Sequence, residues 1–224
     1  MDNVSTRLFA VTTELVTLPT ILEDKKCREI FNTVSESHNI KSYTTLPDGS
    51  VQMSSNEMPP DIGRYRIMRD RISISFEYCS KALSYYSGLI KSFAETYAKV
   101  TKMQLFLMDT NVIRKLVNIR GVEDGREFLI KKVYKLEEKN FAPFGRPLHM
   151  LGGRMFFPPL PEDTTSHEIK TESFMDDYRS IYIEDKAVFS QPVDINNMKN
   201  IETNINKTDD FINNNIIQFL TQFL

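Results

Sequence analysis

The most regular pattern along the chain is an alternation of apolar and polar residues at the end of the segment 64–78. The apolar members are Ile72, Ile74, Phe76 and Tyr78, with serines and a glutamate between them. A period of two residues is typical of a strand that buries one face and leaves the other in water. Upstream apolar residues have the opposite parity, so we expect a bulge or a turn near 69–71.

Further strands are predicted where β-branched and apolar residues cluster between turn signals. They cover 6–18, 40–46, 51–54, 103–119, 154–157, 167–174 and 180–189. Pro47-Asp48-Gly49-Ser50 separates the second of these segments from the third. Proline and glycine there favour a tight turn, so the two segments are predicted to form a hairpin.

Four segments carry apolar residues at three- and four-residue steps, which predicts amphipathic helices. They are 19–36, 80–101, 127–139 and 195–222. Pro19 suits the first turn of the first helix, Ser80 is a good N-cap for the second, and Asp194 can cap the last. The last helix would be roughly 40 Å long at 1.5 Å per residue. It is rich in asparagine, which is a poor residue inside a helix, so packing along its apolar stripe must hold it.

These elements predict an α+β protein with a mainly antiparallel sheet, helices packed on one face and a long C-terminal helix. We expect a single domain over residues 1–224, with a Pro/Gly-rich loop at 141–165 and a closing helix at about 195–222. The strand–helix–strand unit at 64–119 leaves a parallel crossover open as an alternative. Two strand–helix–strand halves suggest an internal structural repeat, although no repeat is visible in the sequence.

The chain of 224 residues has a net charge of −2, but its charge is unevenly distributed. Residues 1–63 carry −4, residues 64–154 carry +9 and residues 155–224 carry −7. Two interpretations stand: the acidic last third folds back on the basic middle, or the middle presents a basic face to nucleic acid or an acidic protein. Four arginines within eight residues are the most unusual local feature. With later basic residues they define a candidate binding patch: Arg64, Arg66, Arg69, Arg71, Arg114, Lys115 and Arg120.

Composition and cysteine usage indicate a cytoplasmic globular protein. No apolar run approaches the roughly 20 residues that span a bilayer, and the N-terminus lacks the pattern of a signal peptide. Cys27 and Cys79 lie far apart in dissimilar contexts, so both are predicted to be reduced thiols.

The search for catalytic chemistry finds only weak candidates. Cys79 precedes a predicted helix, where a thiol pKa can fall, but a buried structural cysteine is the competing interpretation. His149 and His167 flank the Pro/Gly-rich loop and are candidates to meet in space. No metal-ligand spacing, phosphate loop or nucleophile motif occurs in the sequence. We therefore expect no catalytic residue, metal or cofactor, and the sequence favours a protein that is not an enzyme.

The C-terminal helix is predicted to hold the protein to itself or to a partner, because its apolar stripe is long and narrow. The residues assigned to this interface are Ile205, Ile212, Ile216, Phe219 and Phe223. The competing interpretation is that the stripe docks on the chain's own sheet.

The layout from about residue 72 to residue 224 resembles a sporadically distributed, uncharacterised bacterial α+β family. The matching pattern is an aromatic helix around Tyr85 to Tyr97, then a strand over 112–119 that carries Arg114 and Asn118. An acidic strand over 181–189 and a helix with a phenylalanine-rich end at 195–223 complete it. The resemblance implies a bacterial protein but no catalytic residues.

Together these observations lead us to expect a non-enzymatic binding or assembly subunit of a cytosolic bacterial multiprotein system. Defence and toxin–antitoxin systems are the expected context, on the strength of the family's sporadic pattern alone. A nucleic-acid-binding protein that uses the arginine-rich strand without sequence preference is the second hypothesis. An enzyme whose site is dispersed over loops is the third.

Overall fold

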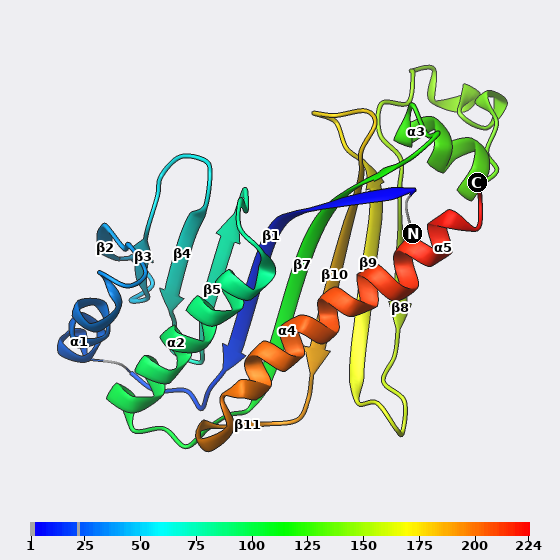
Figure 1. Cartoon of the computed structure of the whole chain (residues 1–224). Coiled ribbons are helices and arrows are strands. Elements are labelled where there is room, and N and C mark those ends of the chain that lie inside the picture. Colours follow the sequence, from blue (N-terminus) through cyan, green and yellow to red (C-terminus); the bar gives the residue numbers. More distant parts are fainter. Residues whose placement is uncertain (1–2, 22) are drawn as a thin grey trace.

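The computed structural model describes residues 3–21 and 23–224 and shows one large antiparallel sheet covered by helices on one face (Figure 1). The strands are β1 (Val4–Val16), β2 (Ser42–Thr45), β3 (Val51–Ser54), β4 (Ile62–Ile67), β5 (Arg71–Glu77), β7 (Met108–Ile119), β8 (Gly152–Phe157), β9 (Thr165–Ser173) and β10 (Ile181–Phe189). Two short strands, β6 (Leu105–Phe106) and β11 (Val193–Asp194), pair separately.

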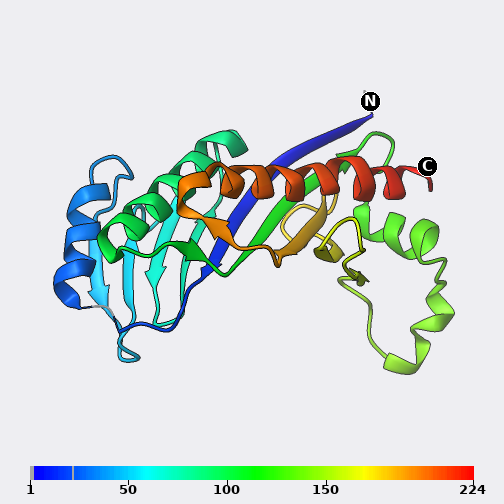
Figure 2. The same cartoon turned by 90° about the horizontal axis from the view of Figure 1, so that it is seen from below.

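The helical elements are fewer and lie between groups of strands. They are α1 (Asp24–Val34), α2 (Leu83–Thr101), α3 (Gly125–Phe128), the π-helical turn η1 (Leu129–Val133), the 3-10 turns η2 (Glu138–Asn140), η3 (Ala142–Phe144) and η4 (Ile195–Asn197), then α4 (Lys199–Phe211), the π-helical turn η5 (Ile212–Ile216) and α5 (Ile217–Thr221). Helices α1, α2, α4 and α5 lie on the same side of the sheet (Figure 2). This confirms the predicted fold class and the long C-terminal helix.

The sheet has an internal two-fold arrangement that the sequence only suggested. Its strand order is β2-β3-β4-β5-β1-β7-β10-β9-β8. Read outward from the centre, the first half runs β1-β5-β4-β3-β2 and the second runs β7-β10-β9-β8. In chain order each half is one strand, a helical segment, a run of strands and a closing helix. The two halves therefore share a topology, with β1 and β7 paired at the centre.

The alternative left open for 64–119, a parallel crossover, is present, and its two strands are separated by a third. Strands β5 and β7 each pair antiparallel with β1, which lies between them. They therefore run in the same direction, and α2 connects them across β1. The segment 64–78 is two strands rather than one, because the chain turns at 68–70 between β4 and β5.

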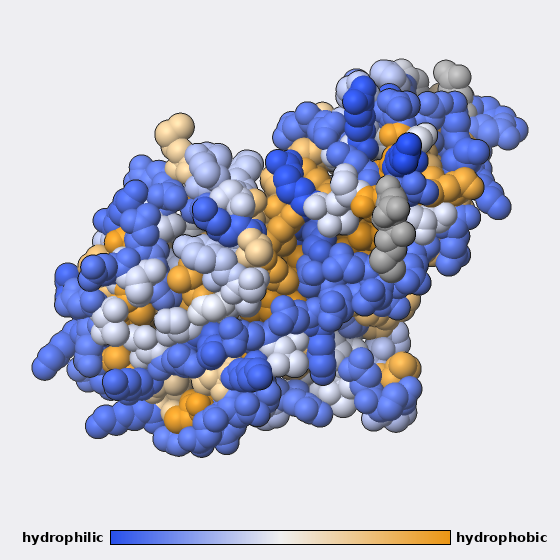
Figure 3. All heavy atoms as spheres, viewed as in Figure 1, coloured by the Kyte–Doolittle hydropathy of each residue, from blue (hydrophilic) through white to orange (hydrophobic). Residues whose placement is uncertain are grey.

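The core lies between the sheet and the helices. Alternate strand residues face the helices, and Tyr65, Ile74, Phe93 and Ile113 are each 0% exposed there. Aromatic rings interlock under α2, where Tyr65 and Phe93 have ring centroids 5.0 Å apart. Seen from the helix side, hydrophilic residues cover the outer surfaces of α2 and α4, and a hydrophobic strip shows between them (Figure 3).

Helix boundaries depart from the predicted ones for local reasons. Helix α1 begins at Asp24, so Pro19 precedes it rather than opening it. Helix α2 begins at Leu83 without a side-chain cap, because Ser80 instead donates its backbone N–H and its hydroxyl to Asp61. The helix expected over 127–139 ends at Val133. Asp194 caps a 3-10 turn by accepting the backbone N–H of Asn196.

The asparagine-rich C-terminal helix is held by polar contacts as well as by its apolar stripe. Asn204 donates to buried Asp109 on β7 at 3.0 Å. Lys115, also on β7, lies 2.6 Å from Asp209 and donates to Asn213 at 2.8 Å. We call these five residues the polar layer. The helix is continuous from Lys199 to Thr221, with the π-helical turn η5 inside it.

The interface assigned to the C-terminal helix needs correction at three of its five residues. Ile205, Ile212 and Ile216 are 0%, 0% and 2% exposed, so they close this chain's own core and present no surface to a partner. The cause is the diagonal course of the helix over the sheet (Figure 1). Phe219 and Phe223 are only partly buried, and their role in an interface stays a prediction.

Candidate functional site

The face of the sheet opposite the helices carries no helix in the described part of the chain, and we call it the open face. Strand alternation places every second side chain there. In the first half these are mainly polar residues of β4 and β5, such as Ser73 and Ser75. In the second half the residues of β9 and β10 alternate in the same way. The open face lacks a covering layer of helices, so it is the first candidate for binding.

The structure brings four of the seven predicted basic residues together on the open face. Arg64 and Arg66 lie on β4, Arg71 on β5 and Arg114 on β7. Arg69 is exposed in the turn between β4 and β5, and Arg120 is exposed just after β7. Arg64 and Arg66 are two residues apart on one strand, so the sequence alone predicts that they share a face. The placement of Arg114 on that face follows only from the strand order of the sheet.

Lys115 does not belong to this patch, which corrects the predicted set. It follows Arg114 on β7 and therefore points to the helix side, where it is 6% exposed. There it pairs with Asp209 of α4. A buried ammonium held by a carboxylate is not available to a phosphate or an acidic partner.

Each of the four arginines on the open face is already paired with a carboxylate. The shortest ion-pair distances are Arg64–Glu77 2.9 Å, Arg66–Asp48 2.5 Å, Arg71–Asp70 2.9 Å and Arg114–Glu184 2.6 Å. Only Glu184 comes from the acidic last third of the sequence. Outside this set, Lys91, Lys115 and Arg154 of the basic middle also pair with Glu202, Asp209 and Glu168 of the acidic last third.

The pair of Arg114 and Glu184 is the most buried of these. Burial by itself would raise the pKa of Glu184, but the hydrogen bond and charge of Arg114 hold that pKa below its usual range. Tyr182 donates a further hydrogen bond to Glu184 at 2.9 Å. A carboxylate stabilised in this way neutralises Arg114 across the whole physiological pH range.

An aromatic cluster lies at one end of the open face, and sequence reasoning missed it. We define it as Phe9, Tyr78, Phe174 and Tyr182. The ring of Phe9 makes edge contacts with the other three, at centroid distances of 5.2, 5.8 and 6.5 Å. A bulge in β1 between Leu8 and Ala10 places Phe9 there. The only signal was the unbroken apolar run of four residues at 8–11 in this strand.

The cluster continues into exposed apolar side chains. Tyr78 is 48% exposed, and in the turn between β9 and β10 Met175 is 73% and Tyr178 is 59% exposed. Tyr78 has a positive φ of 55°, a conformation that non-glycine residues adopt infrequently. Aromatic residues, methionine and arginine are enriched in protein-binding surfaces relative to the rest of a protein's surface.

A buried histidine–aspartate pair lies on the helix side of the second half. His167 Nδ1 is 2.9 Å from Asp185 Oδ2, and the imidazole stacks on Phe211 with centroids 3.8 Å apart. Burial raises the pKa of Asp185, which the hydrogen bond from His167 opposes. The other oxygen, Asp185 Oδ1, is buried with no hydrogen-bond partner among the described residues. The two residues lie on adjacent strands and 18 positions apart, so no local sequence pattern predicted the pair.

The chemistry that this pair can support is limited by what surrounds it. A cavity of about 290 Å³ beside His167 is lined by Asp163, Thr165, Lys207, Asp210 and Asn214, among others. An aspartate can fix the tautomer of a catalytic histidine, but no serine or cysteine lines this cavity. No three histidine, cysteine or acidic side chains in the described ranges are placed to hold a metal ion.

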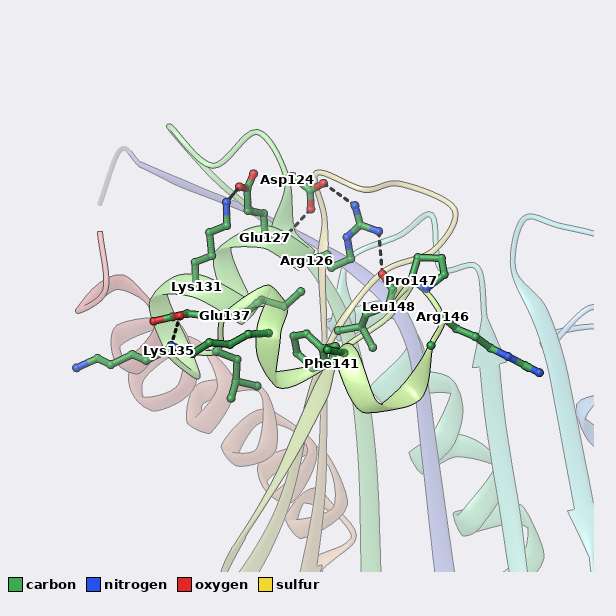
Figure 4. A pocket seen from close by; sticks show the side chains of 15 residues that line it. Asp124, Arg126, Glu127, Lys131, Lys135, Glu137, Phe141, Arg146, Pro147 and Leu148 are labelled. Atoms are coloured by element: carbon green, nitrogen blue, oxygen red, sulfur yellow. Dashed lines mark hydrogen bonds and ion pairs between the residues drawn. The ribbon is translucent and has the colours of Figure 1, made fainter.

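A second, wider hollow lies under the loop that follows η1 (Figure 4). It is lined by residues of α3, η1 and the segment 135–148. Arg126 points across it and donates to the carbonyl of Leu148 at 3.2 Å, with Asp124 at 3.4 Å. The carboxylates of Asp124, Glu127 and Glu137 are paired with Arg126, Lys131 and Lys139, so they form no catalytic arrangement.

The remaining chemical candidates are structural. Burial raises the pKa of Cys79 to about 12 and that of Cys27 to about 11, so neither thiol is a ready nucleophile. Both are free and buried, as predicted. His149 and His167 line different cavities and do not meet.

Comparisons with known proteins add little to this geometry. No protein-family model and no curated protein matches the chain. One solved structure, the aspartate kinase of Clostridium acetobutylicum, aligns over 92% of this chain with 10% identity and a TM-score of 0.22. The chain spans about a third of the length of that structure, since the alignment covers 33% of it. No helix of the described residues is long and apolar enough to cross a membrane.

Proposed function

We propose that the protein is a non-enzymatic binding subunit that holds a protein partner against the open face. The observation that carries this proposal is that ion pairs and exposed aromatic side chains lie next to each other on the uncovered face of the sheet. Arg64, Arg66, Arg71 and Arg114 each face a carboxylate, and the aromatic cluster lies beside them. The partner that fits is a protein with mixed charges around an apolar side chain that seats against Phe9 and Tyr78.

The ion pairs argue against nucleic acid as the main ligand. Phosphate binding would require the arginines to exchange bound carboxylates for phosphates while the displaced carboxylates remained nearby. Nucleic-acid affinity comes largely from unpaired positive charge, and here the charge is compensated. The association with defence or toxin–antitoxin systems stays a prediction that rests on the family resemblance.

Site-specific photo-crosslinking tests the proposal with a matched control. A photoreactive phenylalanine analogue replaces Tyr78 on the open face or Tyr85 on α2, which are 48% and 51% exposed. In the cells that encode the protein, we expect one discrete protein adduct from position 78 and none from position 85. Adding Phe9→Ala should reduce the adduct from position 78, since Phe9 supports the ring.

Fluorescence anisotropy with labelled single-stranded and duplex DNA separates the nucleic-acid hypothesis. We expect no binding at low salt. Binding that falls steeply with salt, and that disappears when Arg64, Arg66, Arg69 and Arg71 are replaced by glutamine, would overturn the proposal. Equal adducts from positions 78 and 85 would overturn it as well, because the open face would then have no preference.

A further inference from the structure

The two halves of the sheet end differently at their outer edges. In the first half β3 is followed outward by β2, whereas in the second half β8 is the last strand. By the shared topology, β8 corresponds to β3, and no strand corresponds to β2. The segment 134–151, which would supply it, contains only two 3-10 turns. The second half is therefore one strand short, and the position beside β8 is vacant.

The β8 edge exposes large apolar side chains. Its sequence is Gly-Gly-Arg-Met-Phe-Phe, and Phe156 and Phe157 are 65% and 41% exposed. Apart from its ladder with β9, the backbone of β8 makes no hydrogen bond among the described residues. Exposed apolar edges are templates for pairing with another strand. The opposite edge, β2, is only four residues long and reads Ser-Tyr-Thr-Thr.

Pairing of β8 with the same strand of a second copy is constrained by the sheet's two faces. Residues that face each other across two paired strands must lie on the same face of the sheet. In an antiparallel pairing of β8 with its own copy, the two-fold axis therefore passes beside one residue, which faces its own copy. Phe156 and Arg154 lie on the open face, and Met155 lies on the helix face. Centring on Arg154 would place two arginines directly opposite each other, which is unfavourable.

Centring on Met155 makes the strand complementary to itself. Met155 then meets its own copy, and Arg154 lies opposite Phe156 of the second copy, where a guanidinium can stack on the ring. Gly153 lies opposite Phe157 of the second copy. Tyr134 crosses directly over Gly153, because a Cβ added there would lie 2.0 Å from the tyrosine hydroxyl. The incoming phenylalanine would therefore meet an aromatic ring rather than a void.

We propose that this protein forms a two-fold dimer in which β8 pairs antiparallel with β8 of a second copy, with Met155 on the axis. The two sheets become one continuous sheet, and the helices of both copies lie on the same side of it. A closed isologous contact satisfies both edges at once. The dimer leaves the open face free, so it goes beyond the partner binding proposed above and does not depend on it.

Sedimentation velocity across a wide range of protein concentration tests the dimer. We expect a reversible monomer–dimer equilibrium in wild-type protein. Phe156→Lys should weaken the dimer by about tenfold or more, equivalent to 1.4 kcal/mol, because it places a charge at the edge. Thr44→Lys is the matched control, an exposed position on the open face of β2, and should leave the equilibrium unchanged.

Crosslinking tests the register independently. Met155→Cys should give a disulfide-linked dimer under mild oxidation, since the two copies of residue 155 face each other. Phe157→Cys should not, because its copies are offset by four residues, about 13 Å along the strand. Thermal unfolding of each variant checks that the fold is retained. A monomer at all concentrations, a dimer that tolerates Phe156→Lys, or equal crosslinking at both positions would each overturn the proposal.

Discussion

The two halves of the sheet share a topology but join their closing helices to the strands with different chemistry. Under α2 the contact is apolar and aromatic, with Tyr65, Phe93 and Ile74 fully buried. Under α4 the polar layer replaces part of that core, with Asp109 and Lys115 on β7 facing the helix. The comparison shows that one arrangement of strands and helices can be closed in two ways. Apolar packing requires side chains of complementary shape, whereas a buried polar layer requires a partner for every charged group.

Loss of the end of the C-terminal helix should have the largest effect on the stability of the fold. Truncation after Asn214 removes Ile216 and Leu220, which are 2% and 0% exposed. Each such loss costs about 2–5 kcal/mol, so together they approach the whole stability of a typical domain. We expect an unfolded or aggregated product, measured by soluble yield and circular dichroism. A soluble, folded product of lower assembly state would show instead that the helix end is an interface.

Breaking the polar layer from one side should cost less. Lys115→Ala leaves Asp209 without its buried cation, and we expect a loss of about 3–5 kcal/mol in the free energy of unfolding. The double variant Lys115→Met with Asp209→Leu should recover most of it, because an apolar pair imitates the first half. Urea denaturation measures both. If Lys115→Ala leaves the free energy of unfolding unchanged, the polar layer contributes no stability. The two halves then differ in geometry alone.

Buried titratable groups in the two halves should change the free energy of unfolding with pH in opposite directions. In the first half, burial lowers the pKa of His38 to about 4 from an unfolded value of 6.5. The unfolded chain then binds the extra proton between pH 4 and 6.5, so this group makes stability rise with pH. In the second half, burial raises the pKa of Asp109 to about 7 from 3.8. There the folded chain holds the extra proton, so stability falls as pH rises from about 4 to 7.

Single variants separate these two slopes. Asp109→Asn should make the unfolding free energy rise more steeply with pH in this window, by up to about 1.4 kcal/mol per pH unit. His38→Gln should make it fall more steeply. Asp185, whose pKa is also raised by burial, contributes a falling slope of its own in both variants. Urea titrations at several pH values provide the measurement, and parallel profiles for the two variants would contradict the assignment.

The smallest effect concerns the two thiols, both of which lie in the first half. Because Cys27 and Cys79 are buried, with pKa values raised to about 11 and 12, we expect very slow reaction with a thiol reagent in the folded protein. Denaturation without reductant should release two reactive groups. Rapid labelling of the folded protein would show that the core of the first half opens more readily than its packing indicates.

The sequence predicted local elements well because their signals are local. The alternation over β5 and the apolar stripe of α4 each report one neighbouring surface. The aromatic cluster could not be predicted in this way, because Phe9, Tyr78 and Phe174 meet only after three separate strands have been placed. The asparagines of the C-terminal helix looked unfavourable by helix propensity, whereas Asn204 and Asn213 bind residues of β7 nearly a hundred positions away.

The central position of β1 has a consequence for synthesis on the ribosome. This strand of 13 residues pairs with β5 on one side and with β7 on the other. Once α2 has emerged, the first half can assemble with β1 at its margin, and the long outer side of β1 then waits for residues 108–119. During that interval the nascent chain exposes an unpaired strand to its neighbours on the same messenger. Because β1 is translated long before β7, the strand at the centre of the finished sheet is an unpaired, aggregation-prone edge in the nascent chain.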